Sequence, residues 1–163
     1  MRFLISIALA GAMVLVSSTA AVAGAPTREP ASPLDATFDA GEVCAFSVHI
    51  ESIGEDVGTI TTFPDGHLLL TGRFFVRITN VETDESIVVN ASGPFVQSFP
   101  DDGTTVFDVH GPFIWILFSG DVGGPGLIYT TGHVSAVASP EFFLTSFDVL
   151  GTQRNLCDDL AAA

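Results

Sequence analysis

Residues 59–79 read TITTFPDGHLLLTGRFFVRIT and predict two β-strands joined by a tight turn. The turn is FPDG at 63–66, where proline presets φ for the first corner and glycine accepts the positive φ that follows. A related turn, FPDDG at 99–103, precedes a second β-rich run. Two hairpins built on similar turns predict an antiparallel meander.

Outward from this stretch, apolar residues alternate with polar ones from Val43 to Leu150. Cys44, Phe46 and Val48, for example, share one face of a strand. Glycine and proline break the pattern often, and no long window has helical periodicity. We therefore expect an all-β domain at 43–163, an antiparallel up-and-down β-barrel of about eight strands, with a β-sandwich as the alternative. Residues 24–42 carry three prolines and predict a flexible N-terminal arm.

Several runs are apolar on both strand faces, which a single-walled barrel in water does not need. The clearest is FIWILF at 113–118, and residues 68–70, 74–76 and 142–144 are similar. We expect the outer face to be covered by the N-terminal arm, by the C-terminal segment or by another subunit of a small homo-oligomer.

Residues 1–23 predict a secretory signal peptide. A basic start is followed by an apolar stretch at 3–16 and by the small residues AVA at 21–23. The apolar stretch is shorter than the roughly 20 residues that span a bilayer. A secreted protein is therefore favoured over an uncleaved membrane anchor.

The two cysteines, Cys44 and Cys157, flank the β region. In an exported protein such a pair predicts one disulfide, and two free thiols are the alternative. The segment after Gly151 ends in NLCDDLAAA and predicts one or two helical turns capped by Asn155.

The net charge is −14, with no lysine and 19 acidic residues. Such a surface repels phosphate groups, so we do not expect nucleic acids or anionic membranes as partners. The acidic residues favour solubility over cation binding, because Asp101, Asp102 and Asp121 lack EF-hand spacing and suit turns. We expect no metal and no cofactor.

Candidate binding residues lie on the predicted strands. Asp108 and His110 are two residues apart and share a face, near the apolar Trp115. Tyr129 and His133 form a second set on one strand face. Such residues can serve acid–base chemistry inside a barrel, but a wet strand face or a hydrogen-bonded core histidine explains them equally well.

Arg73 and Arg77 share a strand face and could hold an anionic ligand group. Pairing with surface carboxylates is the alternative. The chain lacks a Gly-x-Ser-x-Gly elbow, a His-Glu-x-x-His motif, a phosphate-binding loop and Cys-x-x-Cys, which argues against the common hydrolases, metalloproteases, nucleotide enzymes and redox enzymes.

The motifs resemble those of small secreted bacterial β-barrel proteins of unknown function over about residues 43–160. They are CAF at 44–46, TFPDG at 62–66, ITN at 78–80, GD and PG at 120–126, and LC at 156–157. The predicted fold is similar to the barrels of allene oxide cyclases and dirigent proteins. That resemblance implies apolar ligand binding and oligomers, but none of those families' catalytic motifs can be placed on this chain.

Binding of a small apolar ligand without catalysis is therefore the leading hypothesis. An isomerase or cyclase that uses His110 with Asp108, or His133 with Tyr129, is the second. An extracellular structural or interaction module is the third.

Overall fold

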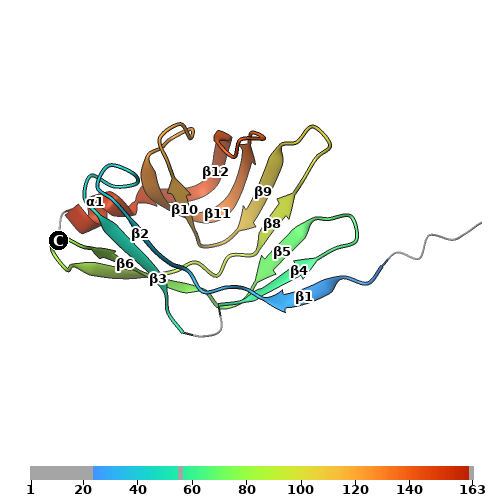
Figure 1. The fold of residues 1–163 in the computed structure, drawn as a ribbon, viewed down its shortest axis with the longest axis horizontal. Coiled ribbons are helices and arrows are strands. Elements are labelled where there is room, and N and C mark those ends of the chain that lie inside the picture. Colours follow the sequence, from blue (N-terminus) through green and yellow to red (C-terminus); the bar gives the residue numbers. More distant parts are fainter. Residues whose placement is uncertain (1–23, 55–56, 162–163) are drawn as a thin grey trace, which may run out of the picture.

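The computed structural model describes residues 24–54 and 57–161, which form β-strands and one short helix (Figure 1). The first six strands are β1 (Thr27–Pro30), β2 (Asp35–Phe38), β3 (Val48–Ser52), β4 (Thr59–Thr62), β5 (Leu68–Thr71) and β6 (Phe75–Asn80). The others are β7 (Ser86–Asn90), β8 (Phe95–Ser98), β9 (Thr105–His110), β10 (Phe113–Leu117), β11 (Gly126–Ala138) and β12 (Leu144–Asn155). The helix is α1 (Leu156–Ala161). The all-β prediction is confirmed.

All strand pairs are antiparallel, and they form two sheets. The larger sheet has the order β1-β4-β5-β8-β9-β11-β10, and β12 pairs with β11. The smaller sheet has the order β2-β3-β6-β7. The hairpin at 59–71 is confirmed: Thr62 pairs with Leu68, and the Gly66 amide donates to the Phe63 carbonyl at 2.8 Å.

A long ribbon of β9–β12 forms the upper part of the molecule in Figure 1. β10 pairs with the first residues of β11 and β9 with the last, while β12 pairs along the other edge of β11. The ribbon bends where three glycines align: Gly132 is opposite Gly151, and the Gly111 amide donates to the Gly132 carbonyl at 2.6 Å.

The bend depends on glycine. Gly132 has a φ of 96°, a backbone angle that residues with a side chain rarely adopt. A Cβ there would overlap the carbonyl oxygen of Leu150, and one at Gly151 would overlap that of Thr131. The strands approach each other so closely at this line because neither residue has a side chain. The bend brings the β10–β11 loop against the start of β12, where the Val122 amide donates to the Leu144 carbonyl at 2.8 Å.

Two hydrophobic cores lie on opposite faces of β10 and β11. The first packs the smaller sheet, α1 and the disulfide against Ile114, Ile116 and Leu127. The second contains Trp115 and Leu117 and is surrounded by phenylalanines. Alternate residues of β10 therefore serve different cores, which accounts within one chain for a run that is apolar on both faces.

The ends of the β region are joined as the sequence predicts. Cys44 and Cys157 form a disulfide with Cα atoms 5.5 Å apart. Asn155 caps α1, because its Oδ1 accepts from the Cys157 amide at 3.0 Å. Both predictions are confirmed.

Two expectations about architecture differ from the structure. The strands of the described residues do not close into a barrel, because β2, β3, β6 and β7 form a separate sheet; the sandwich alternative is closer. Residues 24–42, expected to be an arm, contribute β1 and β2 by pairing with β4 and β3. The predicted signal peptide at 1–23 lies outside the described residues.

The described residues contain no helix with the length and apolar character needed to cross a membrane.

Candidate functional site

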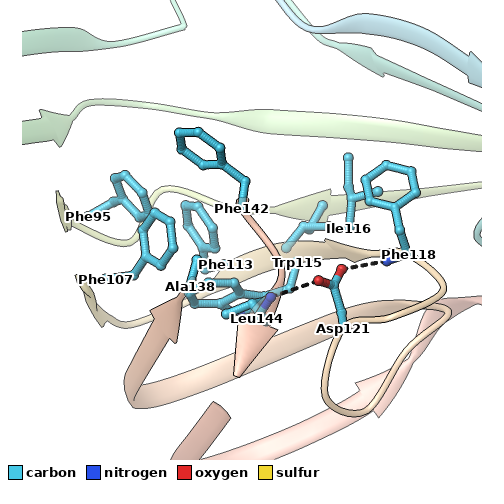
Figure 2. Close-up of a pocket in the computed structure, with 11 residues that line it drawn as sticks. Phe95, Phe107, Phe113, Trp115, Ile116, Phe118, Asp121, Ala138, Phe142 and Leu144 are labelled. Carbon is cyan, nitrogen blue, oxygen red and sulfur yellow. Dashed lines mark hydrogen bonds between the residues drawn. The ribbon is translucent and has the colours of Figure 1, made fainter. Parts of the chain in front are cut away.

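An open cavity of about 360 Å³ lies along β10 at the edge of the larger sheet, and both faces of this strand contribute to its lining (Figure 2). Its walls come from β8, β9, β10, the end of β11, the start of β12 and the two loops that the bend brings together. The lining residues are Phe95, Phe107, Phe113, Ile114, Trp115, Ile116, Phe118, Asp121, Ala138, Phe142 and Leu144. We call this cavity the aromatic pocket.

Asp121 fixes the two loops that bound the aromatic pocket. Its Oδ2 accepts from the Phe118 amide at 2.7 Å, and its Oδ1 accepts from the Leu144 amide at 2.8 Å. Figure 2 shows both bonds as dashed lines from the Asp121 carboxylate. Each oxygen accepts one backbone hydrogen bond, so the carboxylate ties the two loops of the pocket wall together.

The Trp115 ring is the centre of the aromatic wall. Its centroid lies 6.1 Å from that of Phe107, 5.3 Å from Phe113 and 5.1 Å from Phe147, each in an edge-to-face arrangement. Its Nε1 donates to the buried Thr130 Oγ1 at 3.2 Å. The polar atom of the indole is therefore satisfied, and the ring acts as an apolar surface.

Phe142 stands at the mouth of the aromatic pocket. Figure 2 shows its side chain projecting from the β11–β12 turn, with Phe95, Phe107 and Phe113 to one side. The residue is 72% exposed and has a φ of 66°. A positive φ at a non-glycine residue costs roughly 1–3 kcal/mol of conformational free energy. The turn is therefore strained at the residue that presents this large apolar side chain to water.

A second cavity, of about 350 Å³, lies beside the disulfide. Its lining includes Gly41, Ala45 and Asp158, and Phe46 is its single aromatic residue. It therefore lacks the ring surfaces that the aromatic pocket offers to an apolar ligand.

Asp108, His110 and His133 form a cluster on the other face of β9 and β11. The Nε2 of His110 lies 2.9 Å from Asp108 Oδ1, and the Nε2 of His133 lies 3.0 Å from Asp108 Oδ2. The two imidazole rings stack with centroids 4.5 Å apart and planes 12° apart. We call this the Asp–His cluster. It is the set of side chains, among the described residues, that could hold a metal ion.

The cluster changes the acidity of its carboxyl group. The hydrogen bond from His133 lowers the pKa of Asp108 below its ordinary value of 3.8, against a smaller rise from burial. The interactions with His110 lower it further.

The cluster and the aromatic pocket lie back to back across the sheet. Phe107 faces the pocket and its neighbour Asp108 faces the other way, because successive residues of a strand alternate. Val134, in the second core, likewise follows His133. A ligand in the aromatic pocket therefore does not contact the histidines.

The remaining residues singled out from the sequence lie elsewhere. Tyr129 packs against the first core, with the Arg154 guanidinium 5.3 Å above its ring. Arg77 pairs with Glu51 at 2.6 Å, as the surface-pairing alternative predicts, and the Arg73 guanidinium lies 4.9 Å from the Phe75 ring. They do not join Trp115 or the Asp–His cluster.

Most of the aromatic pocket was not identified from the sequence. Trp115 was named, but Phe95, Phe107, Phe113 and Phe142 were not. The available signal was the doubly apolar runs at 113–118 and 142–144, which supply most of the lining. The pairing of His133 with Asp108 was also missed, because it depends on the register of β9 against β11.

Comparisons of the chain with protein-family models, with curated proteins and with solved structures find no match.

Proposed function

We propose that this protein binds a small apolar molecule in the aromatic pocket and does not transform it. The supporting observation is an open cavity of about 360 Å³ walled by six aromatic side chains. Ligand pockets are typically about 300–1,000 Å³ and mainly apolar. A flat, neutral molecule that stacks between rings suits these walls best.

The chemistry of the walls favours binding over catalysis. Asp121 is the charged group in the lining, and its oxygens accept two backbone hydrogen bonds. The Asp–His cluster, which the isomerase hypothesis would use, is on the opposite face of the sheet. Affinity would come from apolar burial and from ring contacts worth about 0.5–1.5 kcal/mol each.

Export from the cell belongs to the same proposal. The disulfide supports folding in an oxidising compartment, where such bonds persist. The leader-like sequence at 1–23 and the acidic, lysine-free composition agree with this location.

The test uses the protein's own reporter. The chain has a single tryptophan, Trp115, and it lies in the pocket wall. Titration with the neutral probe N-phenyl-1-naphthylamine should change the Trp115 fluorescence saturably, with one site per chain. Phe142→Ala should weaken binding, because it removes a pocket ring from an exposed position where folding does not depend on it.

Phe99→Ala is the matched control, because Phe99 is also exposed, at 50%, but does not line the pocket. It should leave probe affinity unchanged. Non-saturable binding, or equal losses in the two variants, would overturn the proposal. The proposal would also be overturned if the protein self-associates and Phe142→Ala separates the copies without changing probe affinity. Phe142 would then serve assembly and not ligand binding.

A further inference from the structure

We propose that Asp108, His110 and His133 bind a divalent transition-metal ion such as Zn²⁺. This inference is independent of ligand binding in the aromatic pocket, because the two sites face opposite sides of the sheet. It also differs from the sequence-based expectation of no metal, which was made without knowledge of which strands pair.

The donor atoms of the three side chains already lie close together. One donor atom from each of the three side chains lies within 4.8 Å of the others. The Nε2 of His110 lies 2.9 Å from Asp108 Oδ1, and the Nε2 of His133 lies 3.0 Å from the other carboxylate oxygen, Oδ2. Ligand atoms bound at about 2.0–2.2 Å to tetrahedral zinc lie roughly 3.3 Å from one another. Small side-chain rotations would therefore suffice to admit the ion.

The paired backbone of β9 and β11 fixes the positions of the ligands in advance. His110 and His133 are directly opposite each other in the β9–β11 register, and Asp108 is opposite Ser135. Side chains directly opposite on antiparallel strands have Cβ atoms about 4.5–5.5 Å apart. Three ligands from two paired strands lose little conformational freedom on binding, unlike ligands scattered over loops.

The chemical types of the donor atoms select the ion. Two imidazoles and one carboxylate suit zinc, copper or nickel, whereas calcium and magnesium take oxygen ligands. The side chains of His133 and Asp108 are 37% and 44% exposed, so water can complete the coordination. Each ring must bind through an unprotonated Nε2, with its remaining proton on Nδ1. The net charge of −14 also favours the approach of a cation.

The chain contains its own controls. Its other two histidines each have one nearby carboxylate: His67 with Asp65 at 2.6 Å and His49 with Asp35 at 3.8 Å. Both pairs are on the surface, but each lacks the second imidazole. They test whether an ordinary His–Asp pair is enough to bind zinc.

The first experiment is a titration of the untagged protein with ZnCl₂, followed by the NMR signals of the four histidine rings. The signals of His110 and His133 should shift together and reach a plateau at one equivalent, while those of His49 and His67 stay in place. Excess CaCl₂ should not reverse the shifts. A common, gradual response of all four rings would overturn the proposal.

Calorimetry of variants gives the second experiment. Asp108→Asn should weaken zinc binding more than about tenfold, because Asp108 is itself a ligand and even the loss of an outer partner of a ligand costs about 10–100-fold in metal affinity. Asp65→Asn, the matched control, should leave the affinity unchanged. Equal affinities in these two variants would overturn the proposal. The NMR titration requires no variant, so it decides the matter even if Asp108→Asn folds poorly.

Discussion

Single side chains decide how the two faces of the β9–β12 ribbon differ. On one face Asp121 accepts two backbone amides and fixes the loops around the aromatic pocket. On the other face, the two Asp108 oxygens contact the Nε2 atoms of His110 and His133. In both places the two oxygens of one carboxylate contact different partners and so join segments that are far apart in sequence.

The Asp108 carboxyl provides a residue-scale prediction for the metal-free protein. His133→Ala should raise the pKa of Asp108 toward 3.8, because the His133 hydrogen bond is the largest cause of its depression. His110→Ala should raise that pKa less. Carbon-13 NMR titration of the carboxyl group measures both. Equal shifts, or a larger one for His110→Ala, would contradict the geometry.

The same depression sets a pH dependence of stability. Because the folded-state pKa of Asp108 is lower than its unfolded value, its contribution is complete above the ordinary pKa and disappears as the pH falls through the folded-state value. Asp108 is 44% exposed, so that contribution is less than about 1 kcal/mol.

Some residue-scale features could be predicted from the sequence because they depend on local chemistry. The FPDG turn at 63–66 and the Asn155 cap involve neighbours within a few positions. The Asp–His cluster could not be completed, because His133 is 25 residues from Asp108. Its place is set by strand register, which the sequence pattern alone does not define here.

At the scale of elements, the bent ribbon organises the molecule. Gly111 and Pro112 form the corner between β9 and β10, but this corner alone does not bend the ribbon. The bend requires Gly132 and Gly151 to lie beside it on the next strands. Each glycine looks unremarkable in the sequence, and their alignment appears only when the strands are paired.

Gly132→Ala tests the bend. The added Cβ would overlap the Leu150 carbonyl oxygen. The alanine backbone would also have to adopt a φ of 96°. We expect a loss of more than about 2 kcal/mol in unfolding free energy, because strain and overlap combine. Probe binding should fall as well, since the bend brings the pocket loops together. Urea denaturation and the Trp115 titration measure the two effects.

Gly54→Ala is the matched control for this prediction. Gly54 has a φ of 95°, but an added Cβ there meets no atom within 4 Å. It should cost only the backbone term of roughly 1–2 kcal/mol and leave probe binding intact. If the two variants lose the same stability, close strand approach at the bend is not what makes Gly132 necessary.

At the scale of the whole molecule, period-two patterning predicted the all-β class but not whether the sheet closes. A barrel and a two-sheet arrangement have similar alternation and similar turns. The doubly apolar run at 113–118 was the informative feature. It was assigned to an outer face covered by the N-terminal arm, the C-terminal segment or another subunit. Ile114 and Ile116 do meet the first core, to which residues 24–42 contribute Phe38 and the C-terminal segment contributes Leu156 and Leu160. Trp115 and Leu117 belong to the second core.

The disulfide connects the smaller sheet to the end of the long ribbon. Cys44 precedes β3, and Cys157 lies in α1, directly after β12. The bond spans 113 residues, so it restricts the unfolded chain strongly. In the chain-entropy model a loop of about 100 residues is worth about 4.7 kcal/mol.

The Cys44→Ala/Cys157→Ala variant should therefore lose about 4–5 kcal/mol in unfolding free energy. Its denaturant m-value should rise, because an unfolded chain without the bond exposes more surface. A reducing agent should bring the wild-type protein to the same midpoint and leave the variant unchanged. If the m-value stays constant while the midpoint falls, the bond acts mainly through packing of the buried sulfurs against the first core. The two sheets would then be held together by that core rather than by restriction of the unfolded chain.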